Sequence, residues 1–236
     1  MSKPYEHFSD IHTLESPREV VPMLLQQIKP TSVLDVGCGT GTWLKVLDEH
    51  GVHDYVGLDG DFVERSQLLI DASRFQAHDL AHPFSLHRVF DLVICLEVAE
   101  HLPASAAPAL IDSLCLHGEV IVFSAAVPGQ GGQNHINEQW PDYWVHLFAK
   151  RGFYVHDTLR PMIWDNPRIA WWYRQNMLVF SKVPSTDKPM RLVHPDCYRE
   201  NLERLTRMNE DARSGRLGVR PSFAIFARSI ASFLKK

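Results

Sequence analysis

The stretch from Ser32 to Trp43 constrains the fold more than any other part of the chain. An apolar run that begins at Ser32 reaches an acid, Asp35, and three glycines follow at positions 37, 39 and 41. A helical spacing of apolar residues starts after Thr42. Glycine lets a ligand approach the backbone closely, and a helix start offers free N–H groups to an anionic ligand group. The stretch therefore predicts a strand, a ligand-binding turn and a helix.

The spacing of the glycines separates two kinds of nucleotide-binding loop. The dinucleotide fingerprint has its third glycine three residues after the second, where this chain has Thr42, so nicotinamide binding is disfavoured. The G-x-G-x-G pattern resembles motif I of class I S-adenosylmethionine (SAM) methyltransferases, whose loop passes beneath the methionine part of the cofactor. The resemblance assigns five residues here to SAM: Asp35, Gly37, Cys38, Gly39 and Gly41.

The following strand-like segments also end at positions that suit this cofactor. Residues 52–59 end in Asp59, and an acid at the end of the second strand of a Rossmann-type sheet binds ribose hydroxyls. Residues 75–80 run into Asp79 and Leu80. The resemblance implies that Asp79 reaches the adenine amino group and that the backbone of Leu80 contacts the ring.

The order of the segments predicts the fold class. Residues 90–96 are continuously apolar, which is typical of a strand buried on both faces of a parallel sheet. Further strands are predicted at 119–124, at 152–160 and at the end of 169–180, the last one reversed. We expect an α/β, Rossmann-like class I methyltransferase fold: a seven-stranded, mostly parallel sheet with helices on both faces. Residues 1–183 form this domain, and residues 184–236 form a linker and a helical C-terminal tail.

A second group of functional residues follows the strand at 90–96. Glu97, Glu100 and His101 have the spacing i, i+3 and i+4, so that one helical turn would bring them to a common face. Two carboxylates and an imidazole at such close range favour a bound divalent ion. The alternative is that Glu97 alone closes the methionine pocket of the SAM site.

The loop at residues 125–140 supplies a further candidate ligand, His135. Glu-x-x-Glu-His followed by a histidine after the fifth strand resembles the metal site of small-RNA 3′-terminal 2′-O-methyltransferases. Ubiquinone-pathway O-methyltransferases share the Glu-x-x-Glu-His part. Residues 15–180 also resemble a bacterial group of methyltransferases tied to surface-glycan pathways. The resemblance implies that a divalent ion (Mg²⁺, Mn²⁺ or Zn²⁺) is held by Glu97, Glu100, His101 and His135.

Two mechanisms remain open at this point. A metal ion that binds a sugar hydroxyl lowers the pKa of that hydroxyl and orients it for methyl transfer, with Glu100, His101 and His135 as the catalytic group. Without a metal, His135 is the first candidate for the general base.

The acceptor site is predicted from polar and aromatic residues near the loop and in residues 160–176. Aromatic faces beside amides and guanidinium groups suit a sugar ring or a nucleotide, although the same aromatics also suit a packed flap. The candidate substrate residues are Asn134, Asn137, Trp140, Arg160, Trp172 and Arg174.

The composition of the chain limits the kinds of partner that it is expected to bind. The net charge of −4 gives no support to duplex nucleic-acid binding, and four scattered cysteines with no signal peptide favour a cytoplasmic protein. The basic, amphipathic residues 214–236 suit packing on the chain's own domain or on a second subunit as a homodimer, or contact with a membrane surface.

These observations predict a SAM-dependent O-methyltransferase that acts on a sugar hydroxyl of a nucleotide sugar or surface glycan, a small-molecule or glycan substrate. Three rivals remain: an RNA 3′-terminal ribose 2′-O-methyltransferase, a metal-free small-molecule methyltransferase, and a SAM-binding protein without catalytic activity.

Overall fold

The computed structural model describes residues 13–216 together with residues 218, 221, 223, 224, 226 and 228. Contacts divide the chain into two compact units, Met1–His194 and Pro195–Lys236. Residues 184–194, predicted as part of a linker, therefore belong to the first unit. Each unit is described by itself.

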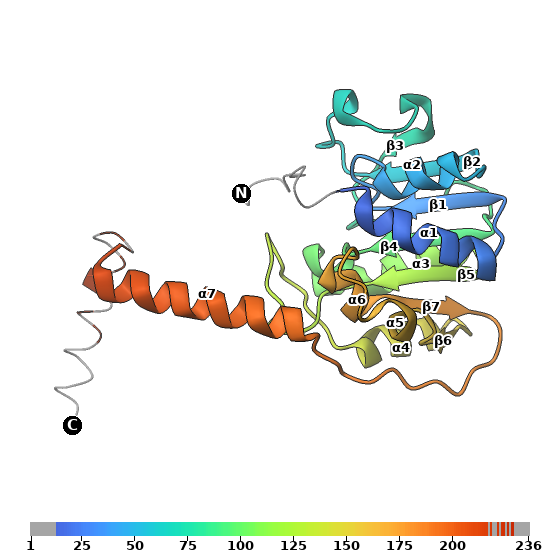
Figure 1. The fold of residues 1–236 in the computed structure, drawn as a ribbon. Coiled ribbons are helices and arrows are strands. Elements are labelled where there is room, and N and C mark those ends of the chain that lie inside the picture. Colours follow the sequence, from blue (N-terminus) through green and yellow to red (C-terminus); the bar gives the residue numbers. More distant parts are fainter. Residues whose placement is uncertain are drawn as a thin grey trace. The chain divides into compact units, whose positions relative to one another are not determined.

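A seven-stranded sheet forms the centre of the first unit, in the order β3-β2-β1-β4-β5-β7-β6 (Figure 1). Its strands are β1 (Ser32–Val36), β2 (Asp54–Asp59), β3 (Phe75–Ala77), β4 (Leu92–Leu96), β5 (Val120–Ser124), β6 (Tyr154–His156) and β7 (Leu178–Ser181). The first five pair in parallel, and β7 runs antiparallel to both β5 and β6. The predicted sheet, with its reversed last strand, is confirmed.

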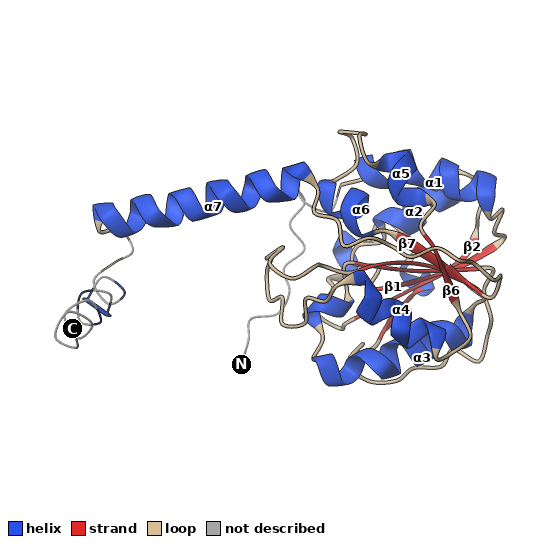
Figure 2. Ribbon diagram, turned by 90° about the horizontal axis from the view of Figure 1, so that it is seen from below, coloured by secondary structure: helices blue, strands red, loops and turns tan. Residues whose placement is uncertain are grey.

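Helices cover both faces of the sheet (Figure 2). One face carries α1 (Glu15–Gln27), α2 (Thr42–Glu49), α5 (Leu159–Ile163) and α6 (Trp171–Asn176). The other carries α3 (Ala107–His117) and α4 (Pro141–Ala149). Each face has its own apolar core: Leu24 and Leu44 lie in the first, and Leu110 and Phe148 in the second. Burial on both faces explains why β1 and β4 are apolar along their length.

One predicted strand is shorter than expected. The strand expected at 152–160 covers only Tyr154–His156, and Arg160 belongs to α5. The chain turns into a helix where the sequence pattern suggested continued strand, and Arg160, in this helix, is buried and pairs with Asp157.

The parallel strands place their carboxyl ends at one edge of the sheet, where the segments after β1, β2, β4 and β5 meet. This is the edge at which open α/β sheets bind ligands. Four short 3₁₀ turns lie among the described residues of the first unit, and the one that matters for the site is η3 (Ala99–His101), shortly after β4.

The second unit contains α7 (Pro195–Ser214), a polar helix as expected. Among the described residues, no helix is both long enough and apolar enough to cross a membrane. The amphipathic segment predicted at 214–236 lies mostly outside the described residues.

Candidate active site

The glycine loop after β1 has the backbone that the sequence predicts. Gly37 and Gly41 have φ of +80° and +85°, and Gly41 is the N-cap of α2. A Cβ on Gly37 would stand 2.2 Å from the Val98 side chain. Only glycine fits at position 37, because both the left-handed backbone and the close neighbour exclude a side chain. Cys38, also predicted in the loop, is buried, and burial raises the pKa of its thiol well above the usual range.

Two acids lie buried beside this loop. Asp59 accepts hydrogen bonds from the backbone N–H groups of Gly39 (2.7 Å) and Gly60 (2.6 Å), and burial raises its pKa to about 6. Asp35 is 2% exposed, and its Oδ2 accepts no hydrogen bond. Burial, followed by the charge of Asp59, raises the pKa of Asp35 to about 8. The two acids therefore favour a cationic or hydroxyl-bearing ligand at this edge.

Asp79 and Leu80 follow β3 at the same edge. The Asp79 carboxylate is largely exposed and accepts a hydrogen bond from the N–H of Ala81 (3.0 Å). The side chain of Leu80 is buried in the core, and the contact of its backbone with the adenine ring stays a prediction.

The segment from Glu97 to His101 departs from the predicted helical turn. Glu97 has φ of +54°, and the turn that follows, η3, is a 3₁₀ helix that starts at Ala99. Because a left-handed residue precedes the turn, Glu97 does not share a helical face with Glu100 and His101. The predicted spacing argument is wrong at this residue.

Glu97 is instead held by side-chain amides. Its carboxylate accepts hydrogen bonds from Asn176 Nδ2 (3.1 Å) and Gln130 Nε2 (3.1 Å). Gln130 Oε1 in turn accepts from Asn176 Nδ2 (2.9 Å) and from Gln175 Nε2 (3.1 Å). Burial raises the pKa of Glu97, and hydrogen bonds from Ser124, Asn176 and Gln130 oppose this shift. We call these four residues, Glu97, Gln130, Gln175 and Asn176, the amide network.

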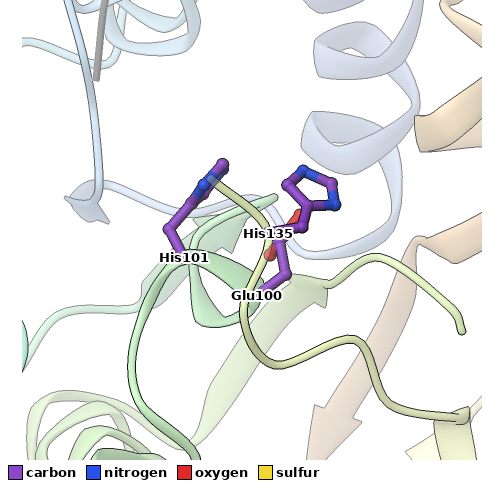
Figure 3. Close-up of side chains that lie close together, drawn as sticks. All are labelled: Glu100, His101 and His135. Carbon is purple, nitrogen blue, oxygen red and sulfur yellow. The ribbon is translucent and has the colours of Figure 1, made fainter. Parts of the chain in front are cut away.

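Three of the four predicted metal ligands come together. Glu100, His101 and His135 each offer a ligand atom, and these atoms lie within 4.8 Å of one another (Figure 3). Glu100 and His101 belong to η3, whereas His135 comes from the loop after β5. The two imidazole rings meet edge to face, with centroids 4.9 Å apart. We call Glu100, His101 and His135 the ligand cluster, and Glu97 is not part of it.

Glu100 is the buried acid of the ligand cluster. Its side chain is completely buried, and neither carboxylate oxygen accepts a hydrogen bond that meets normal geometry. Burial, followed by the charge of Glu97, raises the pKa of Glu100 well above the usual range, and the nearby N–H groups of Glu100 and Ala126 offset this only in part. A buried carboxylate without partners is costly unless it is protonated or a cation neutralises it.

The loop that carries His135 is fixed to η3 and to itself. The backbone N–H groups of Ile136 and Asn137 both donate to the carbonyl of Glu100 (2.9 and 3.0 Å). Within the loop, Glu138 accepts hydrogen bonds from Gly129 and Gly131 and contacts His135 Nδ1 at 3.0 Å. The sequence shows an acid at 138, but nothing in the sequence predicts that it would organise the loop.

The predicted substrate residues divide into two groups. Asn134 is exposed, and Trp140 and Trp172 are half-buried, so ligand contact remains open for these three. Asn137 is buried and donates to the carbonyl of Ala99, which gives it a structural role.

Both predicted substrate arginines are also structural. Arg160 is 2% exposed, pairs with Asp157 and donates to the carbonyls of Gln175 and Met190. Arg174 is buried and donates to the carbonyl of Trp164. Burial and these hydrogen bonds give Asn137, Arg160 and Arg174 structural roles, and their contact with a substrate stays a prediction.

Comparison with known proteins identifies the family to which this chain belongs. A family model described as a methyltransferase domain matches residues 10–160, more than half of the chain. The chain belongs to this methyltransferase family. Among curated proteins, the tRNA U34 carboxymethyltransferase of Helicobacter pylori (strain G27) is 31% identical over 108 residues. The match covers 40% of this chain and 41% of that protein, so this methyltransferase matches less than half the length of its curated relative.

Solved methyltransferases share the fold at low sequence identity. The methyltransferase domain of bacterial CtHen1 has a TM-score of 0.54 at 18% identity, over 72% of this chain and 98% of that one. The sugar N-methyltransferase KedS8 from Streptoalloteichus sp. ATCC 53650 has 0.57 at 18%, over 78% and 96%. SAM-bound CalS10, an amino pentose methyltransferase from Micromonospora echinaspora, has 0.53 at 16%, over 77% and 100%. These likenesses confirm the class I methyltransferase fold.

Proposed function

We propose that this methyltransferase is a SAM-dependent O-methyltransferase whose acceptor is a sugar hydroxyl and whose ligand cluster holds a divalent ion. One observation carries the proposal. The buried Glu100 carboxylate, without hydrogen-bond partners, lies beside two imidazoles at the sheet edge where the fold binds its cofactor.

In this proposal the cofactor occupies the ends of β1, β2 and β3. Asp59 exchanges its backbone partners for the ribose hydroxyls, and Asp79 and the Leu80 backbone meet the adenine. Asp35 and the glycine loop lie under the methionine part. Glu97 belongs with the cofactor rather than with the ion, because the amide network already holds its carboxylate.

The ligand cluster fits a divalent ion chemically. An ion would neutralise the Glu100 carboxylate, which has no hydrogen-bond partner. His101 and His135 each offer a nitrogen atom, and the three ligand atoms lie within 4.8 Å of one another. Two imidazoles and one carboxylate suit a transition ion such as Zn²⁺ or Mn²⁺ better than Mg²⁺, which prefers oxygen ligands. When bound, such an ion lowers the pKa of a hydroxyl that it contacts and orients that hydroxyl.

The protein's own contribution is positioning. Methyl transfer from a sulfonium is an in-line displacement, so the acceptor oxygen has to approach the methyl group along one line. The loop that bears His135 donates two backbone hydrogen bonds to the carbonyl of Glu100. These hydrogen bonds hold the loop beside the edge of the sheet where the cofactor would bind. Trp140 and Trp172, half-buried near this loop and in α6, offer aromatic faces to a sugar ring.

Sugars are favoured as acceptors by chemistry and by likeness of fold. The solved neighbours KedS8 and CalS10 are described as sugar and amino pentose methyltransferases. A sugar hydroxyl is a poor nucleophile and needs activation, which the ligand cluster would supply, whereas an amine needs none. The cluster therefore favours O-methylation over N-methylation.

Two alternatives use the same residues differently. A ribose 2′-hydroxyl at an RNA 3′ end presents the same chemistry to the ligand cluster. A metal-free enzyme would use His135 as a general base, which suits a ring whose Nδ1 is already engaged by Glu138.

The test is conversion of SAM to S-adenosylhomocysteine with four acceptor classes: nucleotide sugars, oligosaccharides, amino sugars and short RNAs. We expect turnover with a sugar hydroxyl, loss of turnover on chelation, and recovery on adding Mn²⁺ or Zn²⁺. A turnover rate that the chelator does not change would contradict the metal role and favour His135 as the general base. Turnover only with amino sugars or only with RNA would overturn the proposed acceptor.

A further inference from the structure

The loop between β5 and α4 contains a carboxylate that has no assigned role. Glu138 is mostly buried, with its side chain 19% exposed, and it accepts two backbone hydrogen bonds and contacts an imidazole within one short stretch of chain. Its Oε2 accepts from the N–H of Gly129 at 2.7 Å, and its Oε1 accepts from the N–H of Gly131 at 2.7 Å. The third contact joins Oε1 to Nδ1 of His135 at 3.0 Å.

These contacts fix the proton on the imidazole of His135. A carboxylate only accepts hydrogen bonds, and both oxygens already accept from backbone N–H groups that only donate. Nδ1 of His135 must therefore carry a proton, and Nε2 is left with a lone pair when the ring is neutral. A ring nitrogen with a lone pair is what a metal ion or a proton of the acceptor requires.

The glycines of the loop are part of the same arrangement. Gly129 and Gly131 have φ of +86° and +72°, which lets their N–H groups converge on Glu138. Gly132 lies against the other nitrogen of His135, since a Cβ there would stand 2.3 Å from Nε2. Glu138 thus contacts Nδ1, and the absence of a side chain at position 132 avoids a collision with the ring at Nε2.

We propose that Glu138 is a positioning residue that holds His135 in the Nδ1–H tautomer and so presents Nε2 to the ligand cluster. The inference rests on the proposed function for its catalytic meaning, but the tautomer can be measured without turnover. Outer partners of this kind, which orient a ligating histidine, typically change metal affinity by about 10–100-fold when they are removed.

The first measurement is the tautomer itself. Protein labelled with ¹⁵N-histidine is examined by long-range ¹H–¹⁵N correlation at pH 8 without metal, and the His135→Gln variant identifies the signals of His135. We expect a protonated Nδ1 and an unprotonated Nε2 in the wild type. A wild-type His135 with its proton on Nε2 would overturn the proposal, whatever the variants do.

The second measurement uses a matched pair of variants. Glu138→Gln keeps the size of the side chain but removes two of the acceptor positions, and Asp142→Asn removes the same charge four residues later. Asp142 is exposed and pairs with Arg191, away from His135. We expect Glu138→Gln to shift His135 toward the Nε2–H tautomer and Asp142→Asn to leave the wild-type signals unchanged. An unchanged tautomer in Glu138→Gln would contradict the assigned role.

Metal titration separates failure of this inference from failure of the proposed function. If the wild type binds Mn²⁺ or Zn²⁺, Glu138→Gln should weaken binding about 10–100-fold, with S-adenosylhomocysteine affinity unchanged. Equal metal affinity in Glu138→Gln and wild type would overturn the positioning role. If the wild type binds no metal, the metal part of the proposed function fails, and the tautomer result alone decides on Glu138.

Discussion

Glu97 and Glu100 are three residues apart, the first half-buried and the second fully buried, yet their surroundings are opposite. Glu97 accepts hydrogen bonds from two side-chain amides, whereas Glu100 has none and faces two imidazoles. Burial raises the pKa of both; side-chain hydrogen bonds from Ser124, Asn176 and Gln130 oppose the shift at Glu97, whereas the charge of Glu97 adds to the shift at Glu100. The contrast shows that hydrogen bonds within the protein support the carboxylate of Glu97 and not that of Glu100, and we propose that a cation fills this role for Glu100.

The same contrast recurs at the other end of the cofactor edge. Asp59 accepts two backbone N–H groups, whereas Oδ2 of Asp35 accepts no hydrogen bond. The pKa of Asp35 is correspondingly raised further, to about 8 against about 6 for Asp59. Each pair thus combines a satisfied acid with an unsatisfied one, which gives four carboxylates to test.

The largest effect is expected from replacing each glutamate by glutamine in turn. At an ion concentration of about 100 times Kd, binding stabilises the wild type by about 2.7 kcal/mol and raises Tm by roughly 5–10 °C. Glu100→Gln should abolish this rise with Mn²⁺ or Zn²⁺, and Glu97→Gln should retain it. Thermal unfolding with and without ion measures both. If both variants lose the ion-dependent rise in Tm to the same extent, the claim that only Glu100 binds the ion is contradicted.

Asp59→Asn should weaken S-adenosylhomocysteine binding roughly 10–100-fold, because charged hydrogen bonds to hydroxyls contribute about 1.5–3 kcal/mol. Calorimetry measures the dissociation constant. Asp61→Asn is the matched control, since the Asp61 side chain is 92% exposed and only two residues away. A larger effect at Asp61 than at Asp59 would mean that the ribose contact has been assigned to the wrong acid.

The pKa of Asp35 predicts a pH dependence of stability in the absence of cofactor. An unfolded chain releases this proton near pH 3.8, whereas the folded protein keeps it to about pH 8. Stability from Asp35 is therefore complete below pH 3.8 and is lost as the pH rises toward 8, by up to about 1.4 kcal/mol per pH unit. Urea unfolding at pH 6, 7 and 8 measures the slope. Asp35→Asn should flatten it, and an identical slope in that variant would refute the assignment.

The smallest effect is expected in the amide network. Asn176→Ala removes hydrogen bonds to Glu97 and Gln130, so we expect a loss of about 1 kcal/mol of stability and a Tm about 2–4 °C lower. Affinity for the divalent ion should stay at the wild-type value. Loss of ion binding in this variant would show that the network and the ligand cluster act as one site.

Local sequence patterns were sufficient for much of the fold and of the cofactor edge. The β-branched runs, the glycine loop and the acid at 59 predict the strands and their ligand-binding ends, because parallel sheets place those ends together. Glu100, His101 and His135 were also found from their types and positions. The roles of all these residues in binding and catalysis remain predictions.

Features set by long-range contacts were not predictable. The left-handed backbone at Glu97 has no sequence signal, since it depends on hydrogen bonds between Glu97 and Ser124 of β5. The sequence suggests that Arg160 binds a ligand. In the fold, its guanidinium group is buried and donates to backbone carbonyls of two distant segments. The role of Glu138 could not be predicted, because its contacts with two glycine N–H groups and with His135 form only when the loop folds back on itself.

The central claim is that Glu100, His101 and His135 hold a divalent ion, and calorimetric titration tests it most directly. Mg²⁺, Mn²⁺ and Zn²⁺ are titrated into wild type and His101→Ala in the presence of S-adenosylhomocysteine. We predict saturable binding of Mn²⁺ or Zn²⁺ to the wild type and its loss in His101→Ala, with S-adenosylhomocysteine still bound. No binding of any of the three ions to the wild type would contradict the account.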